Sequence, residues 1–193
     1  MAKVSSTREN MLTAASSLFR ARGYEGIGIA ELLEKSGAPR GSLYFHFPGG
    51  KEQIGAEVIN DFATRTAARF RELDESGVDI ETFIVSVFKT TAKESKACDF
   101  DGSCPIAAIA AGFGVDDKLL AVAIRDCFAA WEVAIAQAAR SRGMSEANAA
   151  VFASAFLASM EGAFVLSKAQ RSTAPHISAS RAMQALAAAL LKA

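Results

Sequence analysis

The segment SGAPRGSLYFHFPGGKEQ, residues 36–53, decides the fold of this chain. It opens with a Ser-Gly-Ala turn, continues with helical spacing over Pro39–Phe47, and stops at Pro-Gly-Gly. Pro39 suits the first turn of a helix, where its missing N–H has no helical partner. Another short helix is predicted just before the turn, over Ile29–Lys35. Two short helices separated by a tight turn with a glycine predict a helix-turn-helix corner.

The residues of Pro39–Phe47 divide into an inward and an outward set. Leu43 and Phe47 are spaced i and i+4, so we expect them to share one helix face and to pack into the core. Gly41 has no side chain, which permits close approach of a sugar or a backbone. The side chains left to point outward donate hydrogen bonds of the kind that phosphates and base edges accept: Arg40, Ser42, Tyr44 and His46. The alternative is an ordinary amphipathic helix with a half-buried Tyr44.

Helical periodicity continues through the rest of the chain, and no segment shows the sustained alternation of a strand. We therefore expect an all-α fold of about nine helices, with a helix-turn-helix domain over residues 1–50 and a longer helical domain over residues 51–193. Beyond the two short helices, the expected ranges are Ser5–Arg22, Lys51–Leu73, Asp79–Lys96, Ile106–Gly112, Asp116–Arg142, about Ser145–Gln170 and about Ser178–Leu191.

Composition and charge exclude several classes of protein. The 193 residues carry no net charge, which excludes a wholly basic nucleic-acid coat, although residues 1–52 hold seven Lys/Arg against five Glu. The apolar stretch Ala147–Leu166 is interrupted by polar residues, so we interpret it as a buried helix and expect no membrane partner. Three cysteines without metal-ligand spacing, and a start without a signal-peptide pattern, predict no metal, no cofactor and a cytoplasmic location.

Two segments resemble a known family. Residues 36–53 resemble the recognition-helix signature of TetR-family repressors, and residues 11–24, MLTAASSLFRARGY, resemble the first helix of that family. The amino-acid sequence of the first segment is similar to that of the LmrA/YxaF branch of drug-responsive repressors. The specific likeness covers about residues 7–60, and a looser one extends through Cys104-Pro-Ile and Ser159-Met-Glu-Gly.

This resemblance implies a partner, double-stranded operator DNA, and roles for single residues. Tyr44 and His46 match positions that hold phosphates, and Lys51 matches a basic residue that opens the fourth helix and meets phosphate. Arg40 and Ser42 match positions that reach bases. Where the family has Thr or Ser before its second helix, this chain has Ile27 and Gly28. The change removes a helix cap, although the N–H of Gly28 still faces the DNA in this interpretation.

The resemblance also implies that the C-terminal helices bind a small hydrophobic or aromatic effector. Pockets for apolar ligands are lined by aromatic and soft side chains with few polar groups. The candidate lining residues are Phe88, Cys104, Phe113, Phe128, Trp131, Phe156, Met160, Glu161 and Phe164. Each of these residues also fits a plain hydrophobic core.

The same helices are candidates for a homodimer interface. The segment Ala149–Leu166 is apolar nearly all round and rich in Ala and Ser, so it needs neighbours on several sides. The last helix carries a simple apolar stripe. We expect these two helices to pair with those of a second copy through Phe152, Met183, Leu186 and Leu190. The alternative is a monomeric bundle.

Two other functions remain open at this point. Cys98 and Cys104 flank a predicted loop and fit a thiol-based redox-sensing regulator, although two unreactive thiols fit as well. An enzyme or a small-molecule carrier without DNA binding is the remaining alternative. The sequence shows no nucleophile–base pattern, glycine-rich phosphate loop or metal cluster, so we expect no enzymatic activity.

Overall fold

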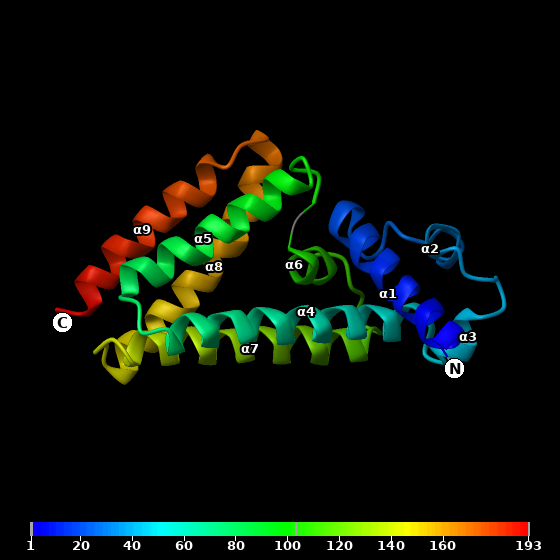
Figure 1. Ribbon diagram of the computed structural model, residues 1–193, viewed down its shortest axis with the longest axis horizontal. Coiled ribbons are helices and arrows are strands. Elements are labelled where there is room, and N and C mark those ends of the chain that lie inside the picture. Colours follow the sequence, from blue (N-terminus) through cyan, green and yellow to red (C-terminus); the bar gives the residue numbers. More distant parts are fainter. Residues whose placement is uncertain (1, 103, 193) are drawn as a thin grey trace. The chain divides into compact units, whose positions relative to one another are not determined.

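The computed structural model describes residues 2–102 and 104–192 and contains nine α-helices and no strand within them (Figure 1). The predicted all-α class is therefore confirmed. The helices are α1 (Ala2–Arg22), α2 (Ile29–Ser36), α3 (Leu43–His46), α4 (Gly50–Glu75), α5 (Ile80–Ala97), α6 (Pro105–Ala110), α7 (Lys118–Arg140), α8 (Glu146–Gln170) and α9 (Ala174–Leu190).

The chain forms two compact units, each with its own core. The N-terminal unit holds residues up to 62 and 104–127, and the C-terminal unit holds 63–102 and 128–192. Helices α4 and α7 contribute residues to both units. This division differs from the single boundary expected at residue 50, because α6 packs on α1 and the start of α7 packs on the start of α4.

The N-terminal unit buries the apolar faces of its short helices in one core. Leu43 and Phe47 are 1% and 0% exposed, as their i, i+4 spacing predicts. They share the core with an apolar stripe of α1, which includes Met11, Ala15 and Phe19. A four-residue helix has almost no stability of its own, so α3 depends on this packing.

The helix-turn-helix corner has a longer connection and a shorter second helix than the sequence predicts. The second helix ends as expected at Gly37, whose φ of +66° is readily adopted by glycine. However, α3 begins at Leu43 and not at Pro39. Gly41 disfavours a helix, and Ser42 closes a turn instead: its hydroxyl and its N–H both donate to the carbonyl oxygen of Pro39, at 2.7 and 3.0 Å.

A close approach at Gly55 joins α4 to α7 within the N-terminal unit. A Cβ at Gly55 would lie 2.7 Å from Cδ2 of Leu120 and 3.2 Å from Cε2 of Tyr24. Nearby, a carboxylate oxygen of Glu52 accepts a 2.7 Å hydrogen bond from the N–H of Leu119 in the first turn of α7. These contacts between residues distant in sequence explain why 104–127 belong to this unit.

The C-terminal unit is built around α8, with α5 and α9 packed along it (Figure 1). Its core is aromatic: the Phe156 ring centroid lies 5.1 Å from that of Phe88 and 5.7 Å from that of Phe152. By length and composition α8 also qualifies as a candidate membrane span, and 44% of its most apolar window is buried. Core helices pass that test as well, so it is weak evidence for a membrane.

Helix α9 begins four residues earlier than predicted. The sequence places Pro175 in a connection and starts the helix at Ser178, whereas α9 starts at Ala174 with the proline in its first turn. Proline is tolerated there because the first N–H groups of a helix have no partner within the helix. The pyrrolidine ring is buried, so Pro175 is also a packing residue.

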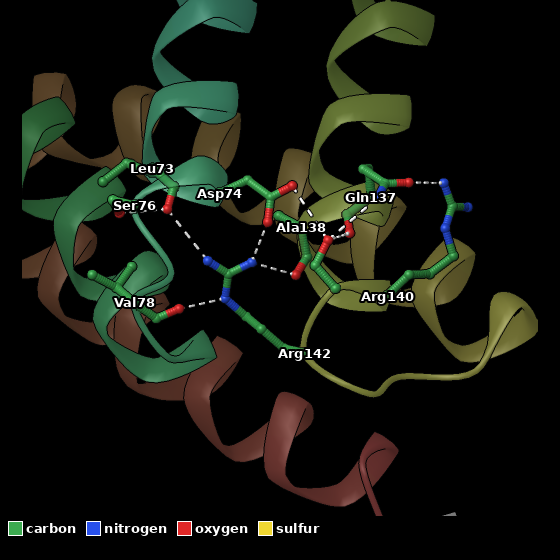
Figure 2. Close-up of polar contacts among 9 residues, drawn as sticks. Leu73, Asp74, Ser76, Val78, Gln137, Ala138, Arg140 and Arg142 are labelled. Atoms are coloured by element: carbon green, nitrogen blue, oxygen red, sulfur yellow. Dashed lines mark hydrogen bonds and ion pairs between the residues drawn. The ribbon is translucent and has the colours of Figure 1, made fainter.

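A buried guanidinium holds the end of α4 against the end of α7 (Figure 2). Arg142 donates from Nη1 to Oδ1 of Asp74 at 2.6 Å and to the carbonyl oxygen of Ala138 at 2.7 Å. Its Nε donates to the carbonyl oxygen of Val78 at 2.7 Å, and its Nη2 to that of Leu73 at 3.3 Å. One side chain thus satisfies helix-end carbonyls from two helices and the connection after α4.

Replacing Arg142 should therefore be costly. We expect Arg142→Ala to lower the free energy of unfolding by about 3 kcal/mol, because it leaves Asp74 and several carbonyl groups partly buried without their donor. The matched control is Arg140→Ala, which removes a pair with Glu146, a residue whose side chain is 81% exposed. That change should cost less than about 1 kcal/mol. Chemical denaturation of both variants measures the difference, and equal losses would contradict the role given to Arg142.

Candidate nucleic-acid interface and effector unit

One face of α3 is exposed while the opposite face is anchored. Tyr44 and Phe45 are 62% and 74% exposed, and they lie between the buried Leu43 and Phe47. Large exposed aromatic side chains side by side are uncommon on a surface without a binding partner. The exposed face of α3 is therefore a candidate contact surface.

The anchored face of α3 is held by a small polar network from α1 and α4. The guanidinium carbon of Arg8 lies 4.8 Å from the ring centroid of Phe47, and Arg8 also pairs with Glu57. Gln53 accepts a 2.9 Å hydrogen bond from the N–H of Gly49 and donates to Glu57 at 3.0 Å. Cation–π and ion-pair contacts of this kind fix the orientation of a short helix.

The structure places all seven predicted DNA-contacting residues in the N-terminal unit. Arg40 and Gly41 are exposed in the turn before α3. Ser42 is half-buried, and because its hydroxyl donates to Pro39, it keeps only acceptor capacity for a base. His46 is half-buried, with its ring centroid 5.1 Å from that of Phe45 at an interplanar angle of 82°.

Tyr44 and Lys51 lie where the chain passes from α3 into α4. A Cβ at Gly50 would sit 3.5 Å from the ring of Tyr44, and Gly50 itself has a φ of +62°, so glycine permits both the turn and the contact. The Nζ of Lys51 lies 4.0 Å from the ring centroid of Tyr24. Burial raises the pKa of Tyr24 above its usual value, and the carboxylates of Asp117, Glu52 and Glu25 raise it further. The ring beneath Lys51 is therefore a neutral phenol.

Gly28 occupies the N-cap position of α2 and is exposed. Its backbone is extended, as a cap requires, and no side chain is available there to accept from the first turn. A Cβ at this position would meet no described atom within 4 Å. The site has room for the hydroxyl residue that the resemblance leads one to expect.

The nine predicted effector-lining residues are divided between the two units. Cys104 and Phe113 belong to the N-terminal unit, where Cys104 is buried and Phe113 half-buried. In the C-terminal unit the structure brings aromatic rings together in pairs. Phe88 packs on Phe156, Phe128 packs on Trp131 at 6.0 Å between centroids, and Phe164 packs on His176 at 5.0 Å; Met160 and Glu161 follow on α8.

Trp131 and Glu161 bring polar atoms into this apolar unit. The indole Nε1 of Trp131 donates to the carbonyl oxygen of Ala63 at 3.1 Å. Both carboxylate oxygens of Glu161 are shielded from solvent. A buried carboxylate on an apolar face is unusual and marks Glu161 as a residue of functional interest.

The thiols lie in different settings. Cys98 is half-buried, and its Sγ donates to the carbonyl oxygen of Ser95 at 3.3 Å, whereas Cys104 is 1% exposed. The two belong to different compact units. A redox sensor that uses both would require oxidant access to a buried thiol, and oxidant-sensitive cysteines are usually exposed.

A buried histidine forms a polar cluster among α5, α8 and α9 that the sequence does not reveal. His176 has no exposed surface; its Nδ1 lies 3.0 Å from the hydroxyl of Thr91, and its Nε2 lies 2.9 Å from the hydroxyl of Ser95. The Thr91 hydroxyl donates to the carbonyl oxygen of Phe88 at 3.0 Å, so it accepts from a protonated Nδ1. Burial lowers the pKa of His176 to about 4, which keeps the imidazole neutral near pH 7.

The predicted dimer residues lie on α8 and α9 and differ in how deeply they are buried. Phe152 and Met183 are 0% and 2% exposed in the single chain and have almost no surface left to offer a second copy, whereas Leu186 and Leu190 are half-buried. The exposed apolar side chains of these two helices are others: Val151, Val165, Leu166 and Ile177. The interface stays a prediction, with these exposed residues as its first candidates.

Two residues of interest were missed from sequence. Phe45 lies off the i, i+4 face defined by Leu43 and Phe47, so helical spacing alone predicts that its side chain points outward. It was missed because an apolar side chain is not expected on an exposed helix face. His176 carries no such signal, because its partners on α5 are more than 80 positions away.

Comparison with known proteins places this geometry in a class of DNA-binding regulators with a helix-turn-helix. Residues 11–58 match the model described as bacterial regulatory proteins of the tetR family. Residues 81–182 match the C-terminal domain of LmrA/YxaF-like transcriptional regulators. The chain belongs to the TetR family of transcriptional regulators and carries an LmrA/YxaF-like C-terminal domain.

Individual relatives match most of the chain. The HTH-type transcriptional regulator LmrA of Bacillus subtilis is 30% identical over 174 residues, which cover 89% of this chain and 93% of LmrA. YxaF of the same organism, an HTH-type transcriptional regulator, is 27% identical over 88% of each chain. A TetR transcriptional regulator from Legionella pneumophila has the same fold, with a TM-score of 0.83 at 16% identity over 91% of this chain and 94% of that one.

Family membership establishes the general role of the chain. TetR-family regulators bind operator DNA, act as dimers and typically respond to ligands. The matched families and relatives are transcriptional regulators, and none of them indicates an enzyme.

The buried imidazole makes stability depend on pH. The pKa of His176 is about 4 in the folded chain and about 6.5 when unfolded, so the unfolded state binds the proton more readily. Its contribution is complete above pH 6.5 and falls as the pH drops to 4, by about 3 kcal/mol in total. Urea unfolding of wild type across this range should show the loss, and His176→Gln should remove this component. The control is His46→Gln, which should keep it; a flat wild-type profile would contradict the assignment.

Proposed function

We propose that this regulator is an operator-binding repressor that a small apolar or aromatic effector releases from DNA, and that it acts in the cytoplasm on an efflux or detoxification gene. The observation that carries the proposal is the exposed face of α3. Tyr44 is exposed on this helix, whose other face is fixed in a core, and Arg40 is exposed in the turn just before it. Arg side chains are the commonest readers of guanine in the major groove, and tyrosine hydroxyls donate to phosphates.

Binding by a dimer follows from the modest charge of one N-terminal unit. Residues 1–52 have a balance of only +2, so a single copy gains little from phosphate neutralisation. Two copies related by a two-fold axis would place two α3 helices about 34 Å apart on a near-palindromic site. The apolar side chains exposed on α8 and α9 support pairing through those helices.

Effector release requires that the ligand bind one state better than the other. The C-terminal unit offers aromatic side chains and the buried carboxylate of Glu161, which suit an apolar molecule with one polar group. A ligand that moves the equilibrium from 1:99 to 99:1 needs about 5.5 kcal/mol of differential affinity. An effector that bound both states equally would release nothing.

Operator binding can be tested with the DNA upstream of the chain's own gene. We expect a gel shift that competitor DNA of unrelated sequence does not abolish and that weakens steeply as salt rises. A thermal-shift screen with aromatic compounds then identifies candidate effectors. Each hit should dissociate the gel-shifted complex of protein and DNA. Hits that raise the melting temperature without releasing the DNA would contradict effector control.

The roles proposed for α3 predict two different kinds of mutant. Tyr44→Phe should weaken binding about tenfold on every operator variant alike, because a phosphate contact carries no sequence information. Arg40→Ala should instead change which operator variant is preferred, with a loss of about 1–3 kcal/mol of discrimination at one base pair. Titration of both variants against a panel of single-base operator changes separates the two effects. The reverse pattern would overturn these role assignments.

A further inference from the structure

Phe45 is the most exposed large aromatic side chain among the described residues, at 74%. Its neighbours Leu43 and Phe47 anchor α3, so the fold does not need Phe45 for that purpose. Its ring centroid lies 5.1 Å from that of His46, at an interplanar angle of 82°, and most of the Phe45 side chain stays in contact with solvent. Together with the adjacent Tyr44, which is 62% exposed, Phe45 forms an aromatic surface on a helix whose opposite face is fixed in the core.

The residues before Phe45 leave open space next to α3. Gly41 lies four residues earlier, and a Cβ there would meet no described atom within 4 Å. Ser42, three residues earlier, donates its hydroxyl proton to the carbonyl oxygen of Pro39. The turn that leads into α3 therefore leaves space beside the helix, and the Ser42 hydroxyl has no free proton to donate.

We propose that Phe45 is a specificity-determining residue that packs against the C5-methyl group of a thymine in each operator half-site. This inference rests on the proposed binding of α3 in the major groove. Among the four bases, thymine alone presents an apolar group on that edge, and phenylalanine is one of the residues that contact it. A phenyl ring gains little from a phosphate, so Phe45 differs in kind from its neighbour Tyr44, whose hydroxyl can donate to one.

A thymine-to-uracil scan isolates this contact, because uracil lacks only the methyl group. The probe is the duplex that full-length wild-type protein selects from a random library. Each thymine in it is replaced by uracil in turn, and the dissociation constant is measured. We expect one thymine per half-site whose replacement weakens binding about fourfold, and about 15-fold when both half-sites are changed.

The variant Phe45→Ala completes a double-mutant cycle with the same duplexes. It should bind the thymine duplex more weakly than wild type does and should no longer distinguish it from the uracil duplex. Phe45→Leu keeps an apolar side chain and should retain part of the discrimination. The matched control is Val115→Ala, which removes an apolar side chain that is 97% exposed elsewhere in the N-terminal unit and should leave the scan unchanged.

The outcomes separate this inference from the proposed function. Because Phe45 is exposed, Phe45→Ala should unfold at the wild-type temperature, and circular dichroism checks this. If wild type selects a duplex but no uracil position matters, or if Phe45→Ala keeps the same uracil penalties, the thymine contact is overturned while operator binding stands. If no duplex is enriched, operator binding itself is overturned and the inference falls with it.

Discussion

The burial of two side chains, Leu43 and Phe47, is the constraint on which the N-terminal unit depends. Four helical residues cannot hold their conformation alone, so α3 exists because its apolar pair is packed against α1 and α4. The contact of Arg8 with Phe47 and its pairing with Glu57 add orientation to that packing. The orientation of α3 is therefore set by residues of other helices, and changes in α1 or α4 can alter the surface that α3 exposes.

The C-terminal unit solves a different problem, because its helices are long enough to be stable in contact with one another. Two of its buried polar side chains lie at helix junctions. Arg142 joins the ends of α4 and α7, and His176 joins α9 to α5. Both side chains satisfy buried partners in an apolar setting, where unmet hydrogen bonds are costly.

The sequence predicts the helices well where periodicity is long and less well where local chemistry decides. The 3.6-residue pattern gives the all-α class and the extent of α8, and Gly37 correctly ends α2. It fails at α3, where a Ser42 hydroxyl competes with the helix, and at α9, where Pro175 starts the helix and does not interrupt it. The packing of residues 104–127 with the N-terminal helices depends on contacts between residues that are far apart in the sequence. Local sequence patterns do not predict such contacts.

Because α4 and α7 each belong to both units, the chain crosses between them three times, near residues 62, 103 and 127. The N-terminal unit is therefore not formed by one continuous segment of the chain. A fragment that stopped at residue 50 would lose Ile54, Val58 and Leu120 from its core. A chimaera that joined this N-terminal unit to the C-terminal unit of another protein would need junctions at all three crossings. Evolution faces the same restriction, which favours divergence of the whole chain over shuffling of its halves.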